Sequence, residues 1–251
     1  MPDPKILLDG VSKAFGPINV LDGVSLAVEP GESLAIIGQS GSGKSVTLKC
    51  ILGLLQPDSG SIKVDGDEIV GLAGLPLDRM RAKFGMLFQG SALFDSMPIW
   101  RNVTFGLTQG RAVDGARMRR IAEENLERVG LDRRILNLRP SELSGGMQKR
   151  VALARAIAPR PEIIFFDEPT TGLDPIRADV INDLIVSLVD DLGVTALTIT
   201  HDMASARKIA HRVAMLYQGR IVWIGPRDRL YDSGNPYVDQ FVQGRAEGPI
   251  T

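Results

Sequence analysis

The stretch Gly38-Gln39-Ser40-Gly41-Ser42-Gly43-Lys44-Ser45 decides the fold of this chain. It matches the pattern G-x-x-x-x-G-K-[ST], a loop that binds nucleotide phosphates. A short apolar run, residues 34–37, precedes it and is typical of a buried strand. The apolar residues that follow recur at helical spacing and are Leu48, Ile51, Leu52 and Leu55. Strand, glycine loop and helix together form the context that this motif requires.

We expect the backbone N–H groups of this loop, together with the N-terminus of the following helix, to bind phosphate oxygens. Lys44 adds a positive charge, and the Ser45 hydroxyl is a candidate ligand for Mg²⁺. The predicted nucleotide-binding residues of this segment are Gly38, Gln39, Ser40, Gly41, Ser42, Gly43, Lys44, Ser45 and Val46. The alternative is a glycine-rich turn that binds nothing. The dinucleotide pattern G-x-G-x-x-G is excluded, because Val46 stands where its third glycine would be.

Length and composition favour a globular protein without a polyanionic partner. The chain has 251 residues, of which 44% are hydrophobic and 24% charged, enough for one large domain or a domain with a subdomain. Its net charge of −1 gives no reason to expect nucleic-acid binding. The single cysteine, Cys50, excludes an internal disulfide, and we expect it to be a buried side chain rather than a reactive thiol. We find neither a signal peptide nor an apolar run that could span a membrane.

Before the glycine loop, residues 6–8 and 24–28 are predicted strands that flank a turn-rich loop over residues 15–23. Phe15 lies in that predicted loop, where its ring could stack on a purine base or could fill a small satellite core. After the loop and its helix, residues 61–65 alternate as a strand between two turns, which indicates a hairpin.

The middle of the chain changes from strand to helix. The apolar run 84–88 ends at Gln89, and an amide at the carboxyl end of a strand can reach a metal ion or a water beside a phosphate; alone it could equally be a solvated side chain. Residues 92–160 are predicted to be a mostly helical insertion, with an amphipathic helix over 117–129. Apolar side chains that could contact a partner, or form this insertion's own core, crowd a predicted loop at its start: Leu93, Phe94, Met97, Ile99 and Trp100.

A second candidate anion site begins the next helix. Ser144 is a natural N-cap, and Gly145 and Gly146 leave the approach to the free N–H groups of the helix open. The alternative is that these residues are only a helix-start turn.

Two carboxylates follow an apolar strand, residues 163–166. Such a strand is covered on both faces, so the carboxylates should emerge at its end. Asp167 suits Mg²⁺, directly or through water, and Glu168 suits the general base that activates an attacking water. The alternative is an acidic pair that caps a helix.

The last third of the chain returns to alternating helix and strand. A helix is predicted over residues 176–191 and a strand over 194–199, after which His201 is placed to contact a γ-phosphate. His211 lies in a polar connection and is interpreted as solvated. Residues 213–217 and 220–224 form a closing hairpin, and residues 226–251 hold two short helical pieces and a polar tail that should be loose unless another surface holds it.

Taken together, these motifs resemble the ATP-binding subunit of an ABC transporter. The resemblance rests on residues 38–45, Gln89, 143–146, 167–168, Asp174 and His201, in this order. It implies the cofactors ATP and Mg²⁺ and two subunits that sandwich two ATP molecules, with residues 143–146 of one subunit facing the glycine loop of the other. By the same resemblance Phe15 takes the place of the adenine-stacking aromatic, and Glu168, His201 and Gln89 are the catalytic residues. Met147 departs from the family's usual Gln, which puts a ribose contact by this loop in doubt.

A narrower resemblance is to the ATPases of Mla/Mce-type phospholipid transporters of bacterial envelopes. Residues 87–97, 166–176 and 240–249 carry it. It implies a membrane permease, an Mce-domain lipid-binding protein and a STAS-domain regulator as partners, at the cytoplasmic face of the inner membrane. In that branch a similar tail reaches across to the neighbouring ATPase, so residues 235–251 are predicted to help dimerisation, with Phe241 as the anchor.

The predicted fold is α/β: a P-loop core with a mainly parallel sheet, an N-terminal antiparallel β-layer and a helical subdomain over about 92–160, all within an ATPase domain of residues 1–234. The predicted function is ATP hydrolysis that drives phospholipid transport. Alternatives are the ATPase of an importer for polar solutes and a soluble ABC ATPase outside transport. A P-loop kinase would leave residues 143–146 unexplained.

Overall fold

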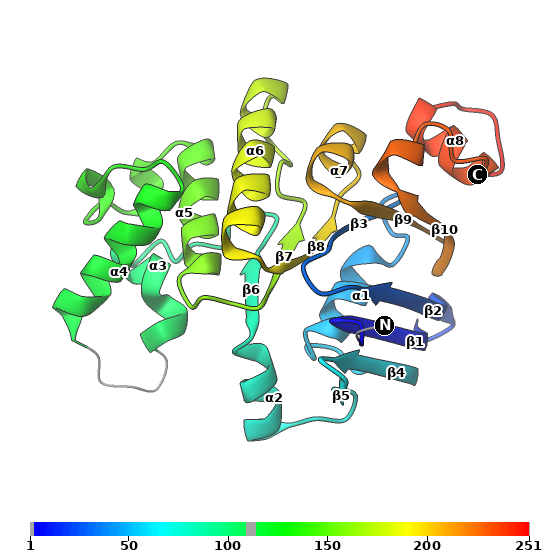
Figure 1. Ribbon diagram of the computed structural model, residues 1–251, viewed down its shortest axis with the longest axis horizontal. Coiled ribbons are helices and arrows are strands. Elements are labelled where there is room, and N and C mark those ends of the chain that lie inside the picture. The colour runs from blue at the N-terminus through cyan, green and yellow to red at the C-terminus, as the bar shows by residue number, and fades with distance from the viewer. Residues whose placement is uncertain (1–2, 109–113, 251) are drawn as a thin grey trace. The chain divides into compact units, whose positions relative to one another are not determined.

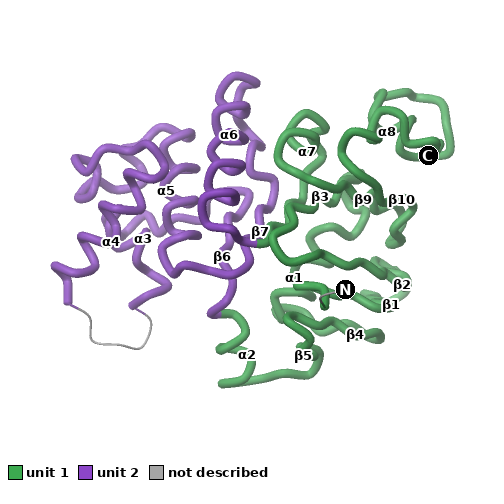
Figure 2. The backbone as a smooth tube through the Cα atoms, viewed as in Figure 1, with its two compact units in different colours: residues 1–81, 195–251 green, residues 82–194 purple. Residues whose placement is uncertain are grey.

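The computed structural model describes residues 3–108 and 114–250 of the chain. These divide into two compact units (Figure 2), unit 1 with residues 1–81 and 195–251 and unit 2 with residues 82–194. Among the described helices, none has both the length and the apolar character needed to cross a bilayer.

Unit 1 contains the predicted antiparallel layer. Its strands pair in the order β2-β1-β4-β5, and the alternate residues Ile6 and Leu8 of β1 are buried, as is Val11 beyond an irregularity in the pairing. The four strands are β1 (Ile6–Phe15), β2 (Ile18–Val28), β4 (Ser59–Val64) and β5 (Asp67–Glu68).

The predicted loop over residues 15–23 is wrong. Phe15 is the last residue of β1 and pairs with Ile18, the first residue of β2, so only Gly16 and Pro17 form the turn. The glycine that suggested a loop, Gly23, lies inside β2 at φ 68°, near an irregularity in the pairing of β1 with β2. Turn-forming residues were therefore mistaken for a loop where they accommodate irregular strand pairing.

The glycine loop follows β3, one of a second set of paired strands in unit 1. Strand β3 (Ser33–Ile37) is buried along its whole length and runs parallel to both β8 (Thr195–Ile199) and β9 (Arg212–Tyr217). Strand β10 (Arg220–Pro226) is antiparallel to β9. Helix α1 (Lys44–Ile51) starts directly after the loop. The remaining helices of this part of unit 1 are α2 (Gly74–Arg81), which was not predicted, and α7 (Met203–Ile209).

Unit 2 combines a parallel strand pair with helices. Strand β6 (Phe84–Leu87) is parallel to β7 (Ile163–Asp167), and α3, α4 and α5 contact one another (Figure 1). The predicted helical character is thus confirmed for the described part of residues 92–160. Ile99 and Trp100 begin α3 rather than lying in a loop. The helices are α3 (Ile99–Thr108), α4 (Gly115–Arg128), α5 (Gly145–Ile157), α6 (Pro175–Leu192) and the 3-10 turns η1 (Arg133–Ile135) and η2 (Pro140–Glu142).

The C-terminal segment packs on unit 1 instead of being loose. It contains η3 (Arg227–Arg229) and α8 (Pro236–Gln243), the two short helical pieces predicted. The side chain of Gln240 both donates to the Ile250 carbonyl oxygen at 3.1 Å and accepts from the Ile250 N–H at 2.7 Å. Ile250 and Val238 join the buried cluster of unit 1. The buried amide of Gln240 and the packing of Ile250 therefore together hold the end of the described tail.

Candidate nucleotide-binding site

The backbones of two strands of unit 1, β2 and β9, crowd the glycine loop after β3. At Gly38, where φ is 150°, an added Cβ would overlap the carbonyl oxygen of Leu216. At Gly43, where φ is 107°, it would lie 2.7 Å from the carbonyl oxygen of Val20. Both backbone conformations also disfavour any residue with a side chain. These two positions require glycine for reasons internal to this chain.

Lys44 and Ser42 point to what the loop is built to hold. The Lys44 ammonium donates to the carbonyl oxygens of Gly38 at 2.7 Å and Gln39 at 2.8 Å, so it is folded over its own loop. The buried Ser42 hydroxyl has no hydrogen-bond partner among the described residues. An ammonium held over the loop and an unsatisfied hydroxyl donor suit the binding of a phosphate. Of the next two predicted residues, in the first turn of α1, Ser45 is exposed and Val46 is half-buried.

Cys50 is on the buried side of α1, as predicted. Burial raises the pKa of its thiol to about 11, so the group is neutral at physiological pH. It takes no part in the candidate site.

Phe15 is available for a contact with a base. The ring is 48% exposed, and the Lys13 ammonium lies 5.7 Å from its centroid. An exposed ring at a strand end is not part of a satellite core, so the structure favours the first of the two interpretations of Phe15.

In unit 2, the helix start at Ser144 is open. The Ser144 hydroxyl accepts a hydrogen bond from the Met147 N–H at 3.4 Å and so caps α5. An added Cβ at Gly145 or Gly146 would have no described atom within 4 Å. The side chain of Gln148 is engaged in its own chain, where it donates to the carbonyl oxygens of Pro140 and Leu143. The glutamine beside Met147 therefore positions the loop rather than facing outward.

The two predicted carboxylates differ in environment. Asp167 is the last residue of β7 and is half-buried, whereas Glu168 is 9% exposed and has a left-handed backbone with φ 49°. The Thr171 hydroxyl donates to Glu168 Oε2 at 3.2 Å. A non-glycine residue in this conformation is uncommon and is found at functional sites. Asp174 instead caps α6 by accepting from the Arg177 N–H.

The remaining predicted residues lie at strand ends, as expected. Gln89 is exposed two residues beyond β6, and His201 is exposed two residues beyond β8. His211 is exposed, in line with its interpretation as solvated, and its Nδ1 also accepts the Ser33 N–H at 3.0 Å at the start of β3. No cluster of three His, Cys, Asp or Glu side chains suited to a metal is found in the described ranges. A Mg²⁺ held mainly by phosphate oxygens and water needs only one or two carboxylates.

Sequence reasoning missed Lys149. This α5 side chain is 5% exposed and donates to the backbone carbonyl oxygen of Gln89. Burial lowers the pKa of the ammonium below its usual range, although the carboxylates of Asp167 and Glu168 act in the opposite direction. No local pattern marks a lysine that binds a segment distant in sequence.

Comparisons with known proteins agree with these features. The family model described as "ABC transporter" matches residues 21–171. The probable ribonucleotide transport ATP-binding protein mkl of Mycobacterium tuberculosis is 40% identical over 98% of this chain and 68% of its own. The intermembrane phospholipid transport system ATP-binding protein MlaF of Escherichia coli is also 40% identical, over 96% of this chain and 89% of its own.

A solved structure gives the same result at the level of the fold. It is a dimeric ATP-binding cassette in a post-hydrolysis state bound to ADP and phosphate, with 34% identity and a TM-score of 0.80 over 88% of this chain and 98% of that one. The predicted α/β cassette fold is confirmed. The chain therefore belongs to the ABC transporter family and is one of its ATP-binding ATPase subunits.

Proposed function

We propose that this chain works as a pair of identical subunits, in which the helix start at residues 144–146 of one copy binds the ATP held by the glycine loop of the other. The observation that carries the proposal is the open start of α5. Gly145 and Gly146 leave the helix N-terminus uncovered by any described atom within 4 Å of their added Cβ positions, although such an end attracts anions. A relative of the same fold is dimeric and bound to ADP and phosphate.

Within this proposal each predicted residue has a role. The loop over residues 38–46 binds the phosphates, and Phe15 stacks on the base. Glu168 accepts the proton of the attacking water, and His201 contacts the γ-phosphate. Ser45, Gln89 and Asp167 would hold Mg²⁺, which neutralises charge on the phosphates when it is bound.

We propose phospholipid as the transported substrate, through a membrane permease. MlaF is similar to this chain over nearly the whole of both sequences and is named for phospholipid transport. The equally identical mkl is named for ribonucleotide transport, which keeps a polar solute as the second candidate. Copurification of the chain with its permease from detergent-solubilised membranes, followed by mass spectrometry of bound small molecules, separates the two. A bound ribonucleotide other than ATP or ADP, without phospholipid, would contradict the lipid assignment.

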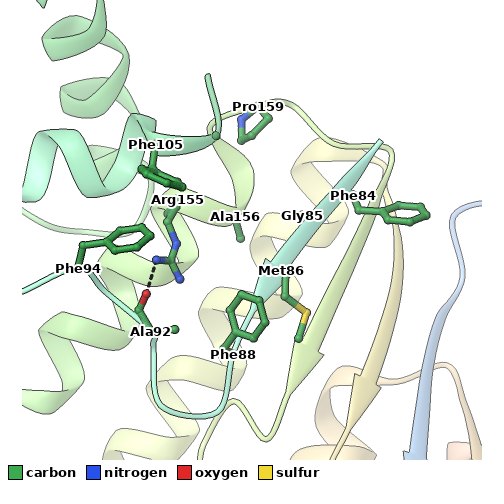
Figure 3. A pocket seen from close by; sticks show the side chains of 11 residues that line it. Phe84, Gly85, Met86, Phe88, Ala92, Phe94, Phe105, Arg155, Ala156 and Pro159 are labelled. Carbon is green, nitrogen blue, oxygen red and sulfur yellow. Dashed lines mark hydrogen bonds between the residues drawn. The ribbon is translucent and has the colours of Figure 1, made fainter. Parts of the chain in front are cut away.

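The permease would dock at an open cavity of about 370 Å³ in unit 2, the apolar cavity (Figure 3). Phe94 is 37% exposed in its wall and packs on Phe105 with ring centroids 4.3 Å apart, whereas Ile99 is fully buried and belongs to the core. Of the predicted contact surface, Phe94 thus lies in the wall and Ile99 in the core, whereas Met97 and Trp100 line another cavity. The lining residues are Phe84, Gly85, Met86, Phe88, Ala92, Phe94, Phe105, Gly106, Arg155, Ala156 and Pro159.

Phe94→Asp tests this docking site. We expect the variant to keep the melting temperature and ATPase activity of the isolated subunit while losing copurification with the permease. Ile99→Asp is the control for a core position and should lower the melting temperature of the free subunit. Normal copurification of a well-folded Phe94→Asp protein would rule out this cavity as the docking site.

Further partners follow from the proposed transport system. These are an Mce-domain lipid-binding protein and a STAS-domain regulator, with the ATPase peripheral to the cytoplasmic face of the inner membrane. Residues 235–251 are proposed to contribute to dimerisation. Because Phe241 packs against the buried cluster of unit 1, Phe241→Ala must be judged by dimer dissociation at matched melting temperature, alongside deletion of residues 244–251. Unchanged dissociation for both variants would leave the tail a purely intrachain element.

A further inference from the structure

One helix of unit 2 binds the loop that follows β6 through two cationic side chains. Lys149, near the start of α5, donates to the Gln89 carbonyl oxygen. Arg155, six residues later, donates through Nη2 to the Ser91 carbonyl oxygen at 2.7 Å and through Nη1 to the Ala92 carbonyl oxygen at 2.6 Å. We call Lys149 and Arg155 the α5 clamp. Figure 3 shows the bond from Arg155 to Ala92 in the wall of the apolar cavity.

The clamped loop has a backbone that does not persist without support. Ser91 and Ala92 have φ values of 62° and 46°, and neither is glycine. Two consecutive residues in the left-handed region are disfavoured, and such a conformation is kept only where surrounding groups fix it. The forked guanidinium of Arg155 binds the carbonyl oxygens of both residues. The loop conformation therefore depends on where α5 lies.

The same helix connects two functional surfaces of unit 2. Its N-terminus is the open anion site at Ser144, and about 8 Å further along the axis, at 1.5 Å per residue, Lys149 holds the backbone of Gln89. Arg155 lies in the cavity wall with Phe94 and Phe105. A helix moves as a rigid element, so a displacement of its N-terminus is transmitted to groups bonded along its length.

We propose that Lys149 and Arg155 are positioning residues that couple ATP bound at the N-terminus of α5 to the conformation of the Gln89 loop and of the apolar cavity. The inference rests on the proposed function, because it requires ATP from a second copy at Ser144. Neither side chain needs to touch ATP. Through their hydrogen bonds the loop moves together with α5. ATP binding therefore changes the affinity for the docked partner, and partner binding changes the affinity for ATP by the same factor.

The alternative is that the clamp only holds the loop in its folded shape. Ala92→Gly separates the two roles, because glycine adopts the left-handed conformation without strain. If Arg155 only supports the loop, the double variant Arg155→Met/Ala92→Gly recovers normal behaviour. If Arg155 couples ATP binding to the loop conformation, the double variant recovers the melting temperature, but its loop conformation still does not change when ATP binds.

The experiment is amide hydrogen exchange of residues 88–94, with and without MgATP, in full-length chains that also carry Glu168→Gln to prevent turnover. We expect MgATP to slow exchange of this segment by about fivefold or more, the lower end of typical couplings. Lys149→Met, Arg155→Met and Arg155→Met/Ala92→Gly should each reduce that change to less than about twofold while the chain still binds ATP. Arg155→Lys, which keeps the positive charge but lacks the planar fork of the guanidinium, should give an intermediate change.

Arg150→Met is the matched control. Arg150 is a cation on the same helix that binds the carbonyl oxygens of Val129 and Gly130, away from the clamped loop, and its removal should leave the ATP response intact. The coupling would be wrong if MgATP slowed hydrogen exchange as much in all clamp variants as in the unchanged clamp, or if the double variant recovered the full ATP effect. Neither result would contradict the proposed ATP-sandwich dimer. A Glu168→Gln chain that stays monomeric with MgATP would overturn the sandwich and the coupling together.

Discussion

The two glycine pairs of this chain serve different purposes. Gly38 and Gly43 are crowded by the backbone of their own unit, with added Cβ atoms in conflict with Leu216 and Val20. Gly145 and Gly146 face no described atom within 4 Å of such a Cβ. The first pair is explained by the folded chain alone. For the second pair, we propose that the open space receives the nucleotide of a second copy.

The same contrast extends to the neighbouring side chains. Lys44 is folded over its loop and the Ser42 hydroxyl is buried, which supports our proposal that this phosphate site is complete in one chain. At the other site Ser144 is exposed and only caps its helix. A complete site and an incomplete site of the same anion-binding kind, in one chain, are what a head-to-tail pair of identical subunits requires.

The largest expected effect concerns the chemistry that both sites share. Glu168→Gln keeps the size of the side chain but cannot accept a proton, so ATP turnover should fall by about 10²–10⁴-fold. Binding of a fluorescent ATP analogue should stay within twofold of the unchanged chain, a difference of about 0.4 kcal/mol. Steady-state phosphate release and equilibrium titration measure the two quantities. Turnover within a few-fold of the unchanged chain would show that another group is the base.

We expect the buried side of α1, which follows the glycine loop, to be inaccessible to solvent and to thiol reagents. Because burial raises the pKa of Cys50 to about 11, the thiolate fraction at neutral pH is about 100-fold lower than for an ordinary thiol. Alkylation of the folded chain by a maleimide should therefore be slower than that of the urea-unfolded chain by at least that factor. Mass spectrometry of samples quenched at successive times gives both alkylation rates. Equal rates would mean that α1 is not packed as the structure has it.

Lys44 and Ser144 should separate binding from hydrolysis. Lys44→Ala removes the loop's own cation, and ATP affinity of the monomer should fall by about tenfold or more, roughly 1.4 kcal/mol. Ser144→Arg fills only the open site, so monomer affinity should be unchanged while hydrolysis stops. Isothermal titration and phosphate release distinguish the two. An equal loss of monomer affinity in both variants would contradict the division between a complete and an incomplete site.

The smallest effect is on stability and tests the glycine pairs directly. Gly43→Ala combines a positive φ with a steric conflict, at a cost of about 1–3 kcal/mol, so the melting temperature should fall by about 2–12 °C. Gly145→Ala places a helix-favouring residue in open space and should change the melting temperature by less than about 2 °C. Differential scanning calorimetry compares them. Equal destabilisation would remove the structural basis of the contrast.

The sequence predicted where most of the candidate site residues lie in the fold, because they follow strands and glycines in recognisable order. Gln89, Asp167 and His201 lie at strand ends, and Ser144 caps its helix, as the patterns indicate. The prediction failed where distant segments decide the conformation. Strand pairing extends β1 to Phe15, and the buried amide of Gln240 secures a tail whose composition suggests disorder. Lys149 binds a carbonyl 60 residues away, which no local pattern records.

The most direct test of the central claim is ATP-driven dimerisation, measured by light scattering during size-exclusion chromatography. The Glu168→Gln chain should elute as a dimer with MgATP and as a monomer without it. Adding Ser144→Arg should keep that chain monomeric with MgATP while its ATP affinity is retained, because the open site of each copy is then blocked. If Glu168→Gln/Ser144→Arg dimerises as readily as Glu168→Gln, residues 144–146 do not bind the nucleotide of a second copy.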